Sequence, residues 1–144
     1  NMLYLWVFGD NVEDRLGHVK YLLFYLATGV AAAWTQVALN MSGETPMGGA
    51  SGAIAGVLGA YLLMYPRSRI NTLVLFMFIT VVQVPALVLL GVWYAMQFFS
   101  GVGSLGTLQG ERVSYWAHVG GFVAGMLFVL LYTTLRREPL WRRR

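Results

Sequence analysis

The chain has 144 residues, of which 58% are hydrophobic and only 11% are charged. Soluble domains carry about 25% charged residues, so this composition indicates that most of the surface faces lipid. The absence of cysteine excludes disulfides and thiol chemistry. The two histidines and six carboxylates show no metal-ligand spacing, and we expect neither a metal nor a cofactor.

The first 40 residues contain one complete apolar span. A helix needs about 20 apolar residues to cross a bilayer. Residues 1–8 are apolar but too few, so we expect the last half of a span there. Residues 9–20 carry the charged side chains of this stretch and predict a polar loop, and residues 21–39 predict a full span.

Two further spans are clear later in the chain. Residues 48–65 are rich in glycine, and Pro66 ends the segment. Residues 114–135 predict the last span before a basic tail. The pattern predicts an all-α polytopic membrane protein, with residues 1–144 as a single domain. The chain starts without an initiator Met or a signal peptide, so we expect an N-terminally truncated fragment.

The apolar segment 70–99 is longer than one span requires. Its first part alternates in polarity at Ile70, Thr72 and Val74, which is typical of extended structure. Proline is tolerated in the first turn of a helix. We therefore expect an extended segment at the membrane interface, followed by a span that begins near Pro85.

The basic residues indicate the orientation of the spans. If the loops alternate between the two sides, nine of the ten basic residues fall on one side, and Arg112 alone falls on the other. The positive-inside rule makes the basic side cytoplasmic and places the C-terminus there. The orientation of the spans and the attraction to anionic headgroups thereby explain the net charge of +4, and we expect no nucleic-acid partner. The basic side holds Arg15, Lys20, Arg67, Arg69, Arg136, Arg137, Arg142, Arg143 and Arg144.

A serine and a histidine lie on small-residue stripes of two spans that run in the same direction. Ser51 is fifteen residues before Pro66 and His118 eighteen before Arg136, which is roughly 22 Å and 27 Å of helix. The two side chains are thus expected at similar depth. Small residues let membrane helices approach closely, and a Ser–His hydrogen bond needs such an approach.

The glycines of both stripes recur at helical spacing. Gly49, Gly52 and Gly56 lie around the serine, and Gly121 and Gly125 follow the histidine. Residues four apart share a face of a helix, so we expect these glycines to support close packing of the two spans.

This pairing predicts a nucleophile and a base. The imidazole of His118 would take the proton of Ser51 and return it to a leaving amine. No Asp or Glu lies within a span, so we expect a Ser–His dyad without a carboxylate. Backbone N–H groups near Ala50 and Ser51, at a helix N-terminus, would form an oxyanion hole.

Less specific interpretations compete with a dyad. A serine among glycines in a membrane helix usually serves packing, and an intramembrane histidine can bond a neighbouring carbonyl. A channel or transporter would use both side chains to line a pore, but it predicts more polar residues along the spans. Matching depth, face and small-residue context together favour the dyad.

At these residues the chain resembles the rhomboid family of intramembrane serine proteases. The run Gly49-Ala50-Ser51-Gly52 resembles the family's nucleophile motif, and the helix from His118 through Gly121 to Gly125 resembles its histidine helix. The resemblance implies a rhomboid-like bundle with about five of six core helices, lacking the first.

The resemblance also implies roles for further residues. Asn1 matches an asparagine of the family's second helix that stabilises the oxyanion, and a histidine four positions earlier would precede this chain. The aromatic that often follows the serine by four residues is replaced by Ala55. Without its first helix the fragment is expected to be weakly active or inactive.

These observations predict an intramembrane serine endopeptidase. It would hydrolyse peptide bonds in or near transmembrane segments of membrane-protein substrates. The expected location is a cell (inner) membrane with several passes, and no oligomeric state is predicted. The alternative is a catalytically inactive rhomboid-like protein that binds client transmembrane helices.

Overall fold

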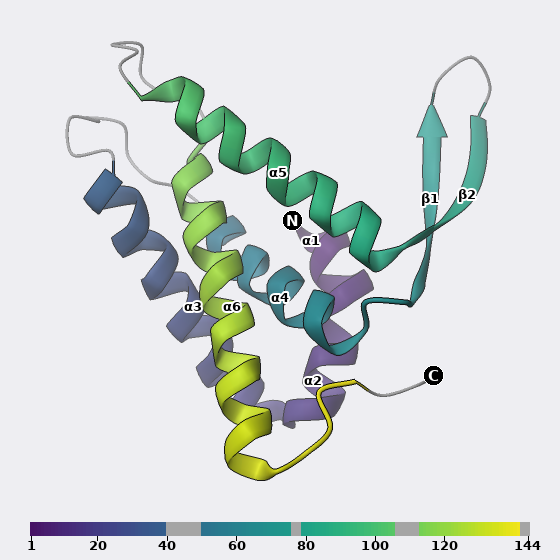
Figure 1. Ribbon diagram of the computed structural model, residues 1–144, viewed down its shortest axis with the longest axis vertical. Helices are drawn as coiled ribbons and strands as arrows, with labels where there is room; N and C mark the ends of the chain where they lie inside the picture. The colour runs from purple at the N-terminus through teal and green to yellow at the C-terminus, as the bar shows by residue number, and fades with distance from the viewer. Residues whose placement is uncertain (40–49, 76–78, 106–112, 142–144) are drawn as a thin grey trace.

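The computed structural model describes residues 1–39, 50–75, 79–105 and 113–141. The N-terminal segment is helical and comprises α1 (Met2–Tyr4), the π-helical η1 (Leu5–Gly9) and α2 (Asp10–Leu16). The long helix α3 (His18–Leu39) follows. The remaining elements are α4 (Ser51–Met64), the strands β1 (Arg69–Leu75) and β2 (Ile79–Pro85), α5 (Ala86–Ser104) and α6 (Tyr115–Arg136). The protein is thus a mostly helical membrane bundle (Figure 1).

The polar loop expected at residues 9–20 is wrong. The chain stays helical to Leu16, reverses at Gly17 with φ +82°, and begins α3 at the next residue. The charges of this stretch do not break the helix, because Val12 and Leu16 are buried on its inner face while Asp10 and Asp14 remain exposed. Glycine adopts a positive φ without the steric penalty of a Cβ, so one residue suffices for the turn.

Helix α4 is the central element, with α3 and α6 packed against it (Figure 1). Every residue from Gly52 to Tyr61 is buried. At 1.5 Å per residue its 14 residues span about 21 Å, less than the roughly 30 Å of a hydrocarbon core. A short helix of small residues fits inside the ring of longer helices and exposes almost no surface to lipid.

The contact between α4 and α6 is made backbone to backbone. A Cβ on Gly121 would overlap the carbonyl of Gly52, and one on Gly125 would overlap the carbonyl of Gly56. On the other side of α4, a Cβ on Gly56 would meet the side chain of Thr28 in α3. Glycine is therefore required at these positions for the helices to keep their spacing.

The apolar segment 70–99 divides as the sequence predicts. Strands β1 and β2 pair antiparallel, with Arg69 opposite Pro85 and Leu75 opposite Ile79. Pro85 is the N-cap of α5, which begins at Ala86. The hairpin stands away from the helices (Figure 1). The expectation of an extended segment followed by a span near Pro85 is confirmed.

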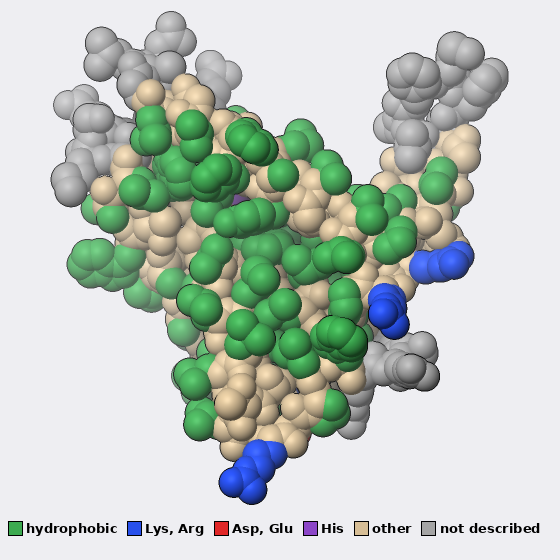
Figure 2. Space-filling model, in the orientation of Figure 1, with side chains coloured by type: hydrophobic (Ala, Val, Ile, Leu, Met, Phe, Trp, Pro, Cys, Tyr) green, Lys and Arg blue, Asp and Glu red, His purple; other side chains and the backbone are tan. Residues whose placement is uncertain are grey.

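The surface of the bundle is apolar along the helices and basic at one end. Helices α3, α5 and α6 are each long and apolar enough to cross a membrane. Leu26 and Trp34 of α3 and Leu131 of α6 are among many large apolar side chains that are more than half exposed. Hydrophobic side chains cover most of the face in Figure 2. The chain is a multi-pass membrane protein.

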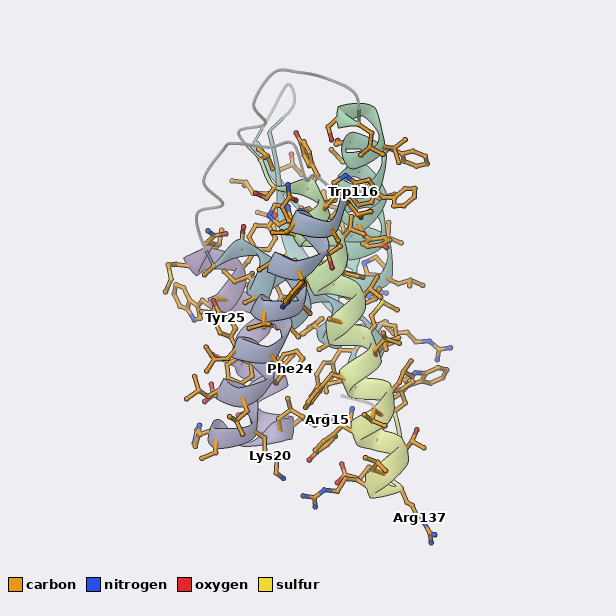
Figure 3. The ribbon with its side chains drawn as sticks, turned by 90° about the vertical axis from the view of Figure 1, so that its left-hand side faces the viewer. Arg15, Lys20, Phe24, Tyr25, Trp116 and Arg137 are labelled. Atoms are coloured by element: carbon orange, nitrogen blue, oxygen red, sulfur yellow. The ribbon has the colours of Figure 1, made fainter. Side chains whose placement is uncertain are left out.

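At the basic end, the segment after α6 also contacts helix α2. Figure 3 shows Lys20 and Arg137 at the end of the bundle opposite Trp116. There the Arg15 guanidinium donates hydrogen bonds to the backbone carbonyls of Pro139 and Leu140. The tail after α6 is thereby fixed against α2.

The backbone contact predicts the effect of one added methyl group. Gly125→Ala places a Cβ on the carbonyl of Gly56, so we expect a loss of about 1–3 kcal/mol in the free energy of unfolding in mixed micelles. Gly91→Ala in α5 is the matched control, since a Cβ there meets nothing within 4 Å. Equal stability of both variants would contradict the close approach.

Candidate functional site

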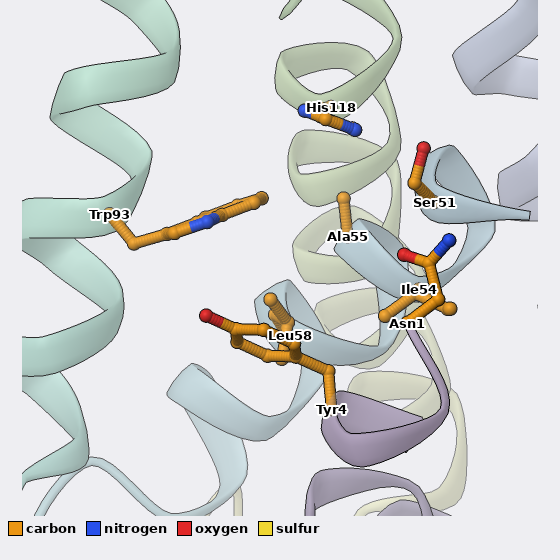
Figure 4. Close-up of a pocket in the computed structure, with 8 residues that line it drawn as sticks. All are labelled: Asn1, Tyr4, Ser51, Ile54, Ala55, Leu58, Trp93 and His118. Carbon is orange, nitrogen blue, oxygen red and sulfur yellow. The ribbon is translucent and has the colours of Figure 1, made fainter. Parts of the chain in front are cut away.

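A cavity of about 150 Å³ lies between the N-terminus of α4 and helices α5 and α6. This volume holds several water molecules. Its lining combines polar and apolar side chains, and Figure 4 shows Ser51 and Trp93 on opposite sides with His118 above them. The cavity is lined by Asn1, Tyr4, Ser51, Ile54, Ala55, Leu58, Trp93 and His118.

Ser51 is the first residue of α4. The preceding Ala50 is the N-cap, and its carbonyl already accepts the first helical hydrogen bond, from the Ile54 N–H at 3.0 Å. The first N–H groups of a helix have no partner within the helix, and the helix dipole favours negative charge beside them. The Ser51 side chain therefore lies where backbone donors are available.

His118 lies in the first turns of α6, with its half-buried ring between α4 and α5. Its Nδ1 is 2.7 Å from Oε1 of Gln97 in α5. Within the described part of the chain, no hydrogen bond joins its imidazole to Ser51, although both line the same cavity. The second histidine, His18, is at the basic end, where its Nδ1 is 2.5 Å from Glu13 Oε1. Only His118 can therefore act in this cavity.

An aromatic ring contacts the histidine from a different helix than the family pattern suggests. Ala55 lines the cavity but offers no ring. The Trp93 ring of α5 lies 5.8 Å from the His118 ring, centroid to centroid, at an interplanar angle of 41°. The imidazole is thus confined by α5, through Trp93 and Gln97 together.

Helix α3 fixes the beginning of α6. Gln36 is buried, and its Oε1 accepts a hydrogen bond of 3.0 Å from the backbone N–H of Ala117. This N–H belongs to the first turn of α6, where no helical partner exists. Gln36 therefore caps α6 one residue before His118. The sequence offered a signal for Gln36 and Gln97, because a glutamine inside an apolar span must find a hydrogen-bond partner.

The other predicted site residues lie around the cavity or beneath it. Asn1 lines the cavity, with its amide below Ser51 in Figure 4. Ala50 is exposed at the start of α4. The four described glycines of the two stripes are buried in the α4–α6 contact, and Gly49 is outside the described residues. In the described ranges, no three histidines or carboxylates lie close enough to hold a metal ion.

Comparisons with known proteins point to one family. The model of the rhomboid domain matches residues 1–135. Rhomboid protein 1, mitochondrial, of Saccharomyces cerevisiae is 31% identical over 133 residues, which cover 89% of this chain and 35% of the yeast protein. The chain thus spans about a third of the length of this relative.

Bacterial relatives match as well. Rhomboid protease GluP of Bacillus subtilis is 34% identical over 76% of this chain and 21% of its own length. Rhomboid protease GlpG of Haemophilus influenzae is 25% identical over 97% of this chain and 64% of its own length. No solved structure matches significantly.

The cap of α6 predicts the consequence of removing one buried amide. Gln36→Leu leaves the Ala117 N–H without a partner, so we expect the free energy of unfolding to fall by about 1–3 kcal/mol. Gln83→Leu, at an exposed position of β2, is the control and should have little effect. A denaturant titration in micelles that gives equal midpoints for both variants would refute the cap.

Proposed function

Because this chain belongs to the rhomboid family, we propose that it is part of an intramembrane serine endopeptidase. Its substrates would be membrane proteins, cleaved in or near their transmembrane segments. The observation that carries the proposal is that Ser51 and His118 line one cavity within a membrane-spanning bundle. The naming of two bacterial relatives as rhomboid proteases supports it.

The proposed reaction is acyl transfer through the serine. The Ser51 Oγ attacks the scissile carbonyl carbon while its proton passes to the imidazole of His118. The C–N bond then breaks, and the imidazolium returns this proton to the leaving amine. The substrate remains as an ester on Ser51 until a water molecule, activated by the same imidazole, releases it as a carboxylic acid.

The negative charge that develops on the carbonyl oxygen needs hydrogen-bond donors. We assign this role to backbone N–H groups at Ala50 and Ser51 and to the Asn1 side chain. The position of Ser51 at the start of α4 supports the backbone part, because these N–H groups have no helical acceptor. The presence of Asn1 on the cavity wall supports the side-chain part.

The orientation in the membrane belongs to the same proposal. The basic end, which holds Arg15, Lys20 and Arg137, would face the cytoplasm together with the C-terminus, as the positive-inside rule requires. His118 follows Trp116, which lies at the end opposite the basic residues in Figure 3, so cleavage would occur near the outer face. Location in a cell (inner) membrane stays a prediction, since the relatives include a mitochondrial protein as well as bacterial ones.

A fluorophosphonate probe tests the nucleophile. We expect the full-length protein to be labelled and to cleave a model transmembrane substrate, and both activities to be lost in Ser51→Ala. His118→Ala should slow labelling by at least about 100-fold, the contribution of a general base. Ser68→Ala is the matched control, because Ser68 lies between α4 and β1 outside the cavity.

Two outcomes would contradict the proposal. Labelling that survives Ser51→Ala would mean that another residue is the nucleophile. Absence of labelling and cleavage in a folded wild-type protein that still retains client helices would instead support the alternative of an inactive rhomboid-like binding protein.

A further inference from the structure

We propose that the Gln97 amide holds His118 in the tautomer that carries its proton on Nδ1, so that Nε2 accepts the proton of Ser51. Gln97 would be a positioning residue, since it acts through the imidazole and does not line the cavity. The inference rests on the proposed role of Ser51 and His118. It replaces a simple dyad with a serine, a histidine and a neutral amide.

The hydrogen-bond chemistry of the two groups leads to this tautomer. The atom of Gln97 that faces the ring is the carbonyl oxygen Oε1, 2.7 Å from Nδ1. A carbonyl oxygen only accepts hydrogen bonds, so Nδ1 must be the donor. A neutral imidazole carries a single N–H, and its other nitrogen then presents a lone pair.

The geometry directs that lone pair toward the serine. Figure 4 shows one ring nitrogen of His118 directed toward Ser51 and the other toward α5. Because Nδ1 bonds Gln97 of α5, the nitrogen on the Ser51 side is Nε2. A base must offer a lone pair at this nitrogen, and the opposite tautomer would place an N–H there.

Gln97 has support from its own helix. Trp93 is four residues earlier on α5, so the two side chains share one face. The Trp93 ring lies beside the imidazole, 5.8 Å away, while Gln97 binds its edge. The contact with Trp93 restricts rotation of the imidazole, and the hydrogen bond with Gln97 selects its tautomer. In serine proteases with a triad, a buried carboxylate performs both tasks.

The tautomer is measurable without enzyme activity. Full-length protein with ¹⁵N-labelled histidine would be studied by NMR in micelles at a pH where the ring is neutral, and the signals lost in His118→Ala identify this ring. We expect a protonated Nδ1 and an unprotonated Nε2. Gln97→Leu should shift the ring toward the Nε2–H form, and Gln97→Glu, which keeps an acceptor oxygen, should retain the Nδ1–H form.

A neighbouring residue of α5 provides the control, and two results would overturn the inference. Met96→Leu is the matched control, because Met96 is the adjacent residue of α5 and is largely exposed. A wild-type ring protonated on Nε2 would mean that the amide is turned with its NH₂ toward Nδ1, and it would overturn the inference. So would a tautomer that does not change in a folded Gln97→Leu variant.

Reaction rates separate this inference from the proposed function. Gln97→Leu should lower kcat for a model substrate by about 10-fold or more with little change in KM, and Gln97→Glu should restore most of it. If wild-type labelling does not depend on Ser51, the proposed function fails while the NMR result stands. If labelling depends on Ser51 but Gln97→Leu reacts at the wild-type rate, only the role of Gln97 fails.

Discussion

The direct approach of the α4 and α6 backbones is the constraint on which the remaining structure depends. Lipid is as apolar as the side chains of these helices, so the hydrophobic effect contributes little to their association and close van der Waals contact must hold them. Gly121 and Gly125 permit that contact at the carbonyls of Gly52 and Gly56. The same approach brings the first residue of α4 near the first turns of α6, where Ser51 and His118 lie.

His118 is positioned by three helices that have different tasks. Helix α6 carries the residue, Gln36 of α3 caps the turn in which it lies, and Gln97 of α5 binds its ring. Each contact supplies a polar partner that the membrane does not offer. The two glutamines are neutral, so they orient the backbone and the imidazole without the cost of burying a charge in the bilayer.

The sequence predicted those features that depend on local pattern. The boundary at Pro85 followed from the conformational limits of proline. Counting residues along two spans led us to expect Ser51 and His118 at similar depth, and both line one cavity. The loop expected at residues 9–20 was wrong because charge was taken as a sign of loop, whereas the buried Val12 and Leu16 define a helix face. The partners of Gln36 and Gln97 lie on other helices, and only tertiary structure identifies such pairs.

The hydrogen bond from Arg15 to the carbonyl of Leu140 joins residues 125 apart in the sequence. This contact forms only after Leu140 has been synthesised. At about 5–20 residues per second, a ribosome needs roughly 6–25 s to cover that distance. During this interval helices α2 and α3 are present without the segment after α6, and Arg15 must be solvated by water or headgroups at the basic end. The segment after α6 can therefore bind α2 only once helices α3 to α6 have been synthesised.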